Sequence, residues 1–180
     1  MLWEITKAYF YSIIVCSIIM FSTTFLLEYL AGRIFIQAAN LMISCAILYA
    51  TFWFEGDKEK NYVQFGRIEP DLNWGLKAGF VGMFIPMITM LLLIAAIVTK
   101  LPDFIVYYKL INPHINMLIN IFIPSLDPSQ ISFVNIILTA ALYLYVPISC
   151  GLGYQLGYRR ISLSEKMVYV DKNKKNAKKK

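Results

Sequence analysis

Residues 78–99 read AGFVGMFIPMITMLLLIAAIVT, a run of 22 residues without a charged side chain. A helix of about 20 residues crosses a hydrocarbon core about 30 Å thick, so this run is long enough to span a bilayer. Its apolar and polar residues do not alternate as they do in the strands of membrane barrels. A helix also satisfies its own backbone hydrogen bonds in lipid. The run therefore predicts a transmembrane α-helix.

Three further runs share these properties and also lack Asp, Glu, Lys, Arg and His; they lie at residues 8–27, 34–54 and 131–158. The 180-residue chain is 58% hydrophobic and 16% charged, with a mean hydropathy of +0.59. A soluble domain is about half apolar and a quarter charged, so this composition excludes a soluble enzyme and a disordered chain. We expect an all-α integral membrane four-helix bundle over residues 1–158, followed by a basic tail at 159–180.

The Lys and Arg residues are unevenly distributed along the chain. Fourteen lie before the first run, between the second and third runs or after the fourth, and three lie on the other side. Positive residues of short loops collect in the cytoplasm, so we expect both termini to be cytoplasmic. The tail holds nine Lys and Arg against two acids, and we expect it to contact anionic lipids of the inner leaflet. The first run is too long for a signal-peptide core and is read as a retained span.

Residues 110–124, LINPHINMLINIFIP, form an apolar segment of 15 residues, or about 22 Å of helix. Asn112 is suited to cap a helix that has Pro113 at its first position. Asn112, Asn116 and Asn120 then form a polar stripe at four-residue steps. A fifth crossing would place the basic tail outside the cell, against the charge distribution. We therefore expect a short interfacial or re-entrant helix on the outer face, between the third and fourth spans.

The sequence offers little material for catalysis or metal binding. The sole histidine, His114, is expected to be solvated or to form a small polar outer site with Asn112 and Asn116. The cysteines lie singly within the spans and are read as packing residues: Cys16, Cys45 and Cys150. Familiar phosphate-binding, nucleophile and zinc motifs do not occur. We expect a protein that is not an enzyme and has no cofactor, metal or nucleic-acid partner.

Two spans carry neutral polar residues that are candidates for ligand binding. Gln37, Asn40 and Ser44 share one face of the second span and either join helices or bind an uncharged ligand. In the fourth span, Pro147 lacks an N–H and predicts a kink. Tyr143 and Tyr145 lie near this kink and need hydrogen-bond partners, which either the local backbone or a ligand pocket supplies. Further along, Gly153 and Gly157 form a GxxxG pair that permits close approach of another helix.

The loop predicted at residues 55–77, EGDKEKNYVQFGRIEPDLNWGLK, mixes five acids with four bases. One interpretation is a charged connector. The other is a cytoplasmic docking surface for a partner, centred on an aromatic and polar group: Tyr62, Gln64, Phe65 and Arg67. The trio of Gln37, Asn40 and Ser44 with the kinked fourth span supports a different function, the binding of a solute.

Two stretches, EGDKEKNYVQFGRIEPD followed by GLKAG, and CGLGYQLGYRRISLSEKMVY, resemble uncharacterised small bacterial multi-pass membrane proteins. The resemblance covers most of residues 55–170 and implies a bacterial plasma-membrane location and four spans. It implies no activity, ligand or catalytic residue. The leading hypothesis is an accessory or scaffolding subunit whose partner is a membrane protein or a second copy of the chain. The alternative is a binding or transport component for a small uncharged solute.

Overall fold

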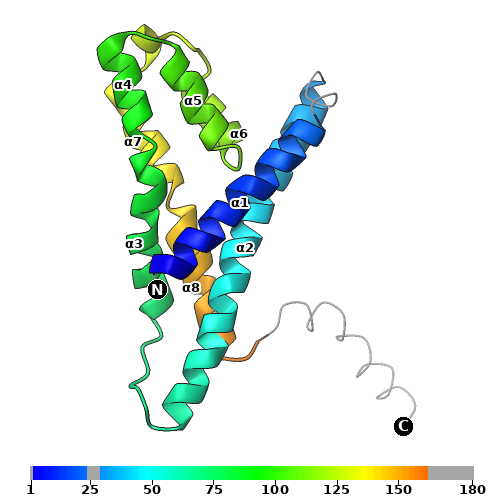
Figure 1. Ribbon diagram of the computed structural model, residues 1–180, viewed down its shortest axis with the longest axis vertical. Helices are drawn as coiled ribbons and strands as arrows, with labels where there is room; N and C mark the ends of the chain where they lie inside the picture. Colours follow the sequence, from blue (N-terminus) through cyan, green and yellow to red (C-terminus); the bar gives the residue numbers. More distant parts are fainter. Residues whose placement is uncertain (1, 24–28, 162–180) are drawn as a thin grey trace, which may run out of the picture.

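The computed structural model describes residues 2–23 and 29–161, and Figure 1 shows that these residues form a helical bundle. The elements are α1 (Leu2–Ser22), α2 (Leu30–Gln64), α3 (Trp74–Ile88), α4 (Leu91–Thr99), α5 (Asp103–Ile111), α6 (Asn116–Phe122), the 3₁₀ helix η2 (Pro128–Gln130), α7 (Phe133–Leu142) and α8 (Tyr145–Tyr158). Within this part of the chain, four helical stretches are long and apolar enough to cross a membrane: Trp3–Ser22, Leu30–Gln64, Trp74–Thr99 and Phe133–Tyr158. The expected all-α integral membrane four-helix bundle is confirmed. The end of the first predicted span and nearly all of the basic tail lie outside the described residues.

The helices converge at one end of the bundle and separate toward the other (Figure 1). Helices α2, α3 and α8 pack together at the convergent end, and α1 packs along α2. Toward the other end, α1 and α2 form one arm, and α4 and α7 belong to a second arm (Figure 1). At the convergent end, α2 extends beyond the predicted span, which was to end at residue 54. We therefore call this end, residues 55–73, the extension end. The opposite end, where residues 99–103 and 123–132 connect the helices, is called the hairpin end.

Helices α2 and α8 approach each other backbone to backbone because glycine occupies their contact. A Cβ atom added at Gly153 would lie within 3.0 Å of the Tyr49 carbonyl oxygen, and one at Gly157 would crowd the Trp53 carbonyl in the same way. Gly56 of α2 meets the backbone of α8 equally closely. The GxxxG pair thus performs the close packing that its spacing predicted. We call this region, residues 49–57 against 153–158, the α2–α8 contact.

The third and fourth spans are each interrupted near their middle. Between α3 and α4, the Thr89 N–H bonds to the Pro86 carbonyl at 3.0 Å, and between α7 and α8 the Tyr143 N–H bonds to the Ala140 carbonyl at 3.1 Å. Both are three-residue steps typical of a 3₁₀ turn. The kink expected near Pro147 is a break at Tyr143, because Pro147 has no N–H to donate to the Tyr143 carbonyl.

The segment predicted as one helix over residues 110–124 is instead the second half of a helical hairpin. Helix α5 begins at Asp103 and ends at Ile111, residues 112–115 turn, and α6 follows. Asn112 ends α5, where its Nδ2 donates to the Tyr108 carbonyl at 2.9 Å, and Pro113 lies in the turn. Helix α5 contacts α4, and α6 contacts α7 and α2, so the hairpin fills the space between the arms (Figure 1). It enters and leaves at the hairpin end, which is the re-entrant form of the two that the sequence left open.

Candidate functional site

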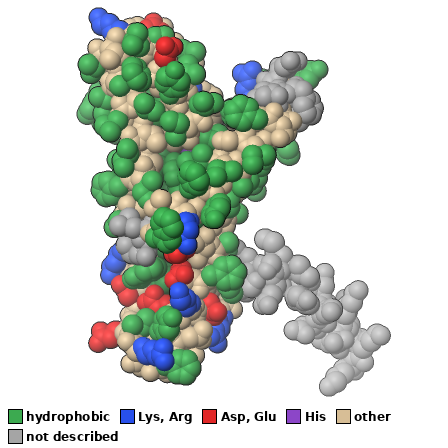
Figure 2. Space-filling view, in the orientation of Figure 1, with side chains coloured by type: hydrophobic (Ala, Val, Ile, Leu, Met, Phe, Trp, Pro, Cys, Tyr) green, Lys and Arg blue, Asp and Glu red, His purple; other side chains and the backbone are tan. Residues whose placement is uncertain are grey.

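The residues proposed for docking lie at the end of an unexpectedly long helix. The second span was predicted to end at residue 54 and to be followed by a loop, but α2 continues for ten residues to Gln64. Charge keeps residues 55–64 out of lipid without breaking the helix, since Glu and Lys are good helix formers. An i,i+3 ion pair of 3.6 Å joins Lys58 to Glu55 along this extension. Figure 2 shows Lys, Arg, Asp and Glu gathered over the extension end, below a mainly hydrophobic surface.

All four predicted docking residues are exposed at the end of this extension. Phe65 is 76% exposed, and the Arg67 guanidinium lies 6.0 Å from the centroid of its ring. Tyr62 and Gln64 are exposed on the last helical turns. Gly66, with φ of 66°, turns the chain in the left-handed region, and the Arg67 N–H returns to the Tyr62 carbonyl at 3.0 Å. This glycine-based C-cap fixes the direction in which the chain leaves the helix.

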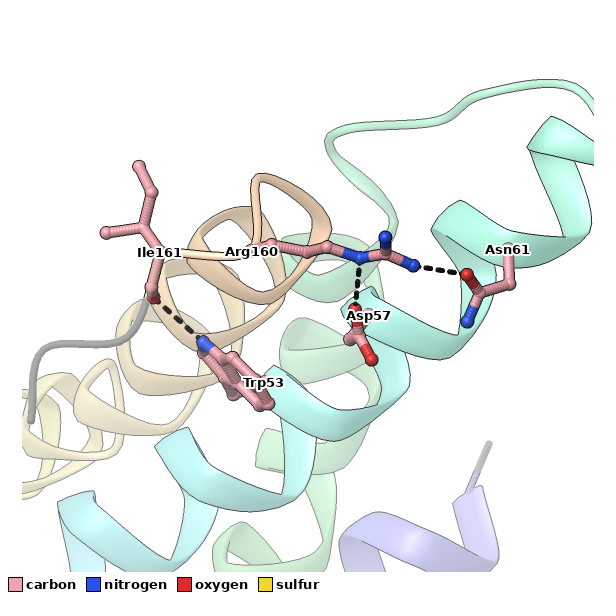
Figure 3. Close-up of polar contacts among 5 residues, drawn as sticks. All are labelled: Trp53, Asp57, Asn61, Arg160 and Ile161. Atoms are coloured by element: carbon pink, nitrogen blue, oxygen red, sulfur yellow. Dashed lines mark hydrogen bonds and ion pairs between the residues drawn. The ribbon is translucent and has the colours of Figure 1, made fainter. Parts of the chain in front are cut away.

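The extension is braced against the end of α8 by polar contacts (Figure 3). Arg160 donates through Nε to Asp57 Oδ1 at 2.8 Å and through a second nitrogen to Asn61 Oδ1. Trp53 Nε1 donates to the Ile161 carbonyl at 2.9 Å. Residues about 100 positions apart in the chain therefore hold the extension in one orientation relative to the bundle.

On its other side, the extension leads into a short connection that is fixed before α3 begins. Asp71 accepts a hydrogen bond from the Lys77 ammonium at 2.7 Å and another from the Asn73 N–H at 3.0 Å. Both bonds lower the pKa of the Asp71 carboxyl below its ordinary value, and the bond from Lys77 has the larger effect. The exposed docking residues are therefore held between two anchored elements.

A second candidate site lies inside the bundle, where the turn of the hairpin meets the broken helices. Tyr9 of α1 donates its hydroxyl hydrogen to Asn112 Oδ1 at 3.2 Å, and the Tyr9 hydroxyl oxygen lies 3.3 Å from His114 Nε2. The His114 ring stands edge-on to the Tyr9 ring, with 5.2 Å between centroids. We call this group, which is buried except for the half-buried Thr89, the polar junction: Tyr9, Thr89, Tyr108, Asn112, His114 and Tyr143.

Asn112 connects both broken helices within the polar junction. Its Oδ1 also accepts from the Tyr143 hydroxyl at 3.2 Å, and its Nδ2 donates to Thr89 Oγ1 at 3.1 Å. The Tyr143 hydroxyl lies 2.9 Å from that of Tyr108 and 3.2 Å from Thr89 Oγ1. Non-helical backbone at membrane depth is tolerated where protein surrounds it, and these bonds supply such surroundings.

The structure divides the five predicted ligand-binding residues. Tyr143 belongs to the polar junction, and Tyr145 lies beside it, with its hydroxyl 3.4 Å from Ser44 Oγ. Asn40 instead joins α2 to α1, because its Nδ2 donates to the Cys16 carbonyl at 3.4 Å. Gln37 lies on the same face of α2 one turn earlier, and is buried. The second span therefore contributes Ser44 to the surroundings of the junction, while Asn40 acts between helices.

His114 is buried, so its expected solvation is wrong. Its side chain is 0% exposed, and its Nδ1 has no hydrogen-bond partner among the described residues. In the tautomer in which the Tyr9 hydroxyl hydrogen goes to Asn112, His114 Nε2 donates to Tyr9 and Nδ1 is the acceptor nitrogen. Sequence reasoning named His114 and Asn112 as one possible polar site but placed it on the outer surface, so it missed the burial of this residue among the helices. The turn signal Asn112-Pro113 inside an apolar segment was the available clue.

Comparison of the chain with models of known protein families, with curated proteins and with solved structures found no match. The resemblance to small bacterial membrane proteins therefore stays a prediction. Among the described residues, no group of three or more His, Cys, Asp and Glu side chains is placed to hold a metal ion. The candidate sites are thus defined by their geometry alone: an exposed docking surface at the extension end and a buried polar junction.

Proposed function

We propose that this protein is an accessory or scaffolding subunit of a membrane complex in the bacterial plasma membrane. The observation that carries the proposal is the exposure of Phe65 beside Arg67 on a braced helix end. Aromatic and Arg side chains contribute most of the binding energy in many interfaces. A surface that is already held in place loses less conformational freedom when a partner binds. The partner is another membrane protein or a second copy of the chain.

The distribution of charge supports an orientation with the extension end and both termini in the cytoplasm. Six basic residues lie at or beside the extension end and three lie toward the hairpin end: Lys58, Lys60, Arg67, Lys77, Arg159 and Arg160 against Arg33, Lys100 and Lys109. Positive residues near span ends stay in the cytoplasm. In this orientation, the basic tail lies near the anionic lipids of the inner leaflet. The docking surface then faces cytoplasmic or juxtamembrane parts of a partner.

Photo-cross-linking tests the docking proposal. A benzophenone amino acid placed at Tyr62 of the full chain should give a cross-linked band in native membranes. Phe65→Ala with Arg67→Ala should remove the band and the co-purified partner. The matched control is Phe84→Ala, which truncates a phenylalanine of similar exposure in the middle of a span. An unchanged band in the double variant contradicts the proposal.

A second function, the binding of a small uncharged solute, is favoured by the unpaired Nδ1 of buried His114. Broken helices that meet at a polar cluster are typical of transporter binding sites. The free acceptor nitrogen suits a solute that donates an N–H or O–H.

Urea, acetamide and glycerol are suitable probes. At least one should raise the melting temperature of the detergent-solubilised protein, and His114→Phe should remove that shift. Asn40→Leu, outside the junction, should keep it, and no shift with any probe contradicts this function.

A further inference from the structure

Two adjoining hollows at the hairpin end belong neither to the docking surface nor to the polar junction. Each has a volume of about 300 Å³. One lies between the end of α6 and the start of α7, and the other lies between the end of α4 and η2. Asp127 and Ile131 line both hollows. A volume of this size has room for about ten water molecules, which is enough for a small polar group.

The hollows carry one negative and one positive side chain. Both hydrogen bonds that Asp127 accepts from Ser129, at 2.9 Å from N and 2.8 Å from Oγ, fall on Oδ1, so Oδ2 retains its lone pairs for a ligand. Both bonds also lower the pKa of the Asp127 carboxyl, and the bond from the Ser129 side chain has a larger effect than the bond from its backbone. Lys100, at the end of α4, lines the second hollow. A ligand that fits this pair carries an ammonium and an anionic group a few bonds apart.

The remaining walls combine apolar side chains with neutral polar ones, Ser125, Gln130 and Asn135 among them, and their apolar part reaches exposed hydrophobic surface. Ile121, which lines the first hollow, is 62% exposed, and Phe133, two residues after the lining residue Ile131, begins a helix that is long and apolar enough to span a membrane. A charged group bound here therefore has hydrocarbon beside it. This combination distinguishes a lipid headgroup from a freely soluble zwitterion, since only the lipid has chains to place along these walls.

We propose that the two hollows bind the headgroup of phosphatidylethanolamine. Its primary ammonium donates hydrogen bonds to Asp127, its phosphate pairs with Lys100, and its acyl chains lie along the apolar walls. Phosphatidylglycerol offers Asp127 no cation. The quaternary ammonium of phosphatidylcholine has no N–H to donate. The site therefore selects between phospholipids by the chemistry of the headgroup amine.

Lipid titration of the purified full chain in detergent tests this proposal, with the midpoint of thermal stabilisation as the readout. Short-chain phosphatidylethanolamine, phosphatidylcholine and phosphatidylglycerol are added in parallel, together with free phosphoethanolamine. We expect phosphatidylethanolamine to bind about two- to fivefold more tightly than the other two lipids, as one partly exposed ion pair allows. Equal binding of the three lipids overturns the proposal. Stabilisation by free phosphoethanolamine equal to that by the lipid overturns the assignment to a lipid.

Two variants and a control test the roles of the side chains. Asp127→Asn keeps an oxygen to accept from Ser129 but loses the charge, so it should bind phosphatidylethanolamine no better than phosphatidylglycerol. Lys100→Gln should weaken binding of all three phospholipids. Asp103→Asn removes a charge at the same end without lining either hollow and should leave the preference intact. A preference that persists in Asp127→Asn, with native mass spectrometry showing the same bound lipid, contradicts the proposed site.

Discussion

The α2–α8 contact and the polar junction hold helices together in opposite ways. In the first, Gly153 and Gly157 bring two backbones together, and close packing joins the helices. In the second, Asn112 collects hydrogen bonds from separate helices across interrupted backbone. Lipid removes most of the hydrophobic drive for helices to associate, so packing of small residues and side-chain hydrogen bonds are the means that remain. This protein uses one means at its convergent end and the other where its arms separate.

The two regions should therefore respond differently to substitution. A backbone contact has no flexible group that can move aside, so one added methyl group affects the whole interface. One substitution in a hydrogen-bonded cluster removes only the bonds of the substituted residue, because each remaining hydroxyl keeps another partner. The α2–α8 contact also positions the extension, whereas the junction connects the hairpin to α1 and to the two broken helices.

The largest expected effect follows from Gly157→Ala. The new Cβ would lie within 3.0 Å of the Trp53 carbonyl oxygen, and α2 would have to move. We expect the free energy of unfolding to fall by about 3 kcal/mol. Gly151→Ala is the matched control on the same helix, because the new Cβ there meets the flexible Leu76 side chain at 3.3 Å. Unfolding in sodium dodecyl sulfate, followed by circular dichroism, measures both. Equal stability of the two variants would contradict a glycine-dependent contact.

Asn112→Leu should have a smaller effect on the polar junction. The substitution removes bonds to Tyr9, Tyr143 and Thr89, and interhelical hydrogen bonds in membranes contribute about 0.6 kcal/mol each. We therefore expect a loss of about 2 kcal/mol in the same unfolding assay. Asn120→Leu, on α6 of the same hairpin, is the control and should change stability by less than about 0.5 kcal/mol. A variant Asn112→Leu as stable as the unmodified protein would show that the junction contributes nothing to folding.

The α2–α8 contact was more accessible to sequence reasoning than the polar junction. Four uncharged runs predicted the spans because length and composition alone decide whether a helix fits a bilayer. The spacing of Gly153 and Gly157 predicted a close approach, although it did not name α2 as the partner. Pro147 likewise predicted an interruption near Tyr143. Each of these signals is local, since the physical cause lies within a few residues of its effect.

The polar junction depends on contacts between residues far apart in the chain, and local patterns do not contain them. Tyr9 and Asn112 are 103 positions apart. Whether a short apolar hairpin lies on the surface or between helices depends on the space that α1, α2, α4 and α7 leave for it. The length of α2 was missed for another reason. The charged residues at 55–64 lie outside the lipid, so the span ends before them, and the end of the span was taken for the end of the helix.

Arg160→Ala separates the orientation of the extension from the stability of the bundle. Its contacts with Asp57 and Asn61 are exposed, and exposed ion pairs contribute at most about 1 kcal/mol. We expect a loss of that size or less in unfolding, with faster amide hydrogen exchange confined to the last turns of α2. Lys58→Ala, which removes the looser 3.6 Å pair with Glu55, is the control and should leave exchange unchanged. Faster exchange spread over α8 as well would contradict a brace that acts only on the extension.

The smallest expected effect concerns pH at the connection before α3. Because hydrogen bonds lower the pKa of Asp71 in the folded protein, its stabilising contribution is present above the ordinary carboxyl value of 3.8. That contribution is lost as the pH falls through the lower folded-state pKa. Melting temperatures between pH 6 and pH 3 should therefore fall slightly less in Asp71→Asn than in the unmodified protein, and the difference should shrink in 1 M salt.

Asp103→Asn provides the control for this pH series, because it removes a carboxylate at the opposite end of the bundle. The Asp71 carboxylate is exposed, so water and salt screen its bond to Lys77 and keep the effect small. We expect Asp71→Asn to change stability least and Gly157→Ala most. If Asp71→Asn changed the stability of the protein as much as Gly157→Ala does, this order of effects would be contradicted. In that case the connection before α3, and not the α2–α8 contact, would be the main determinant of how the extension end is held.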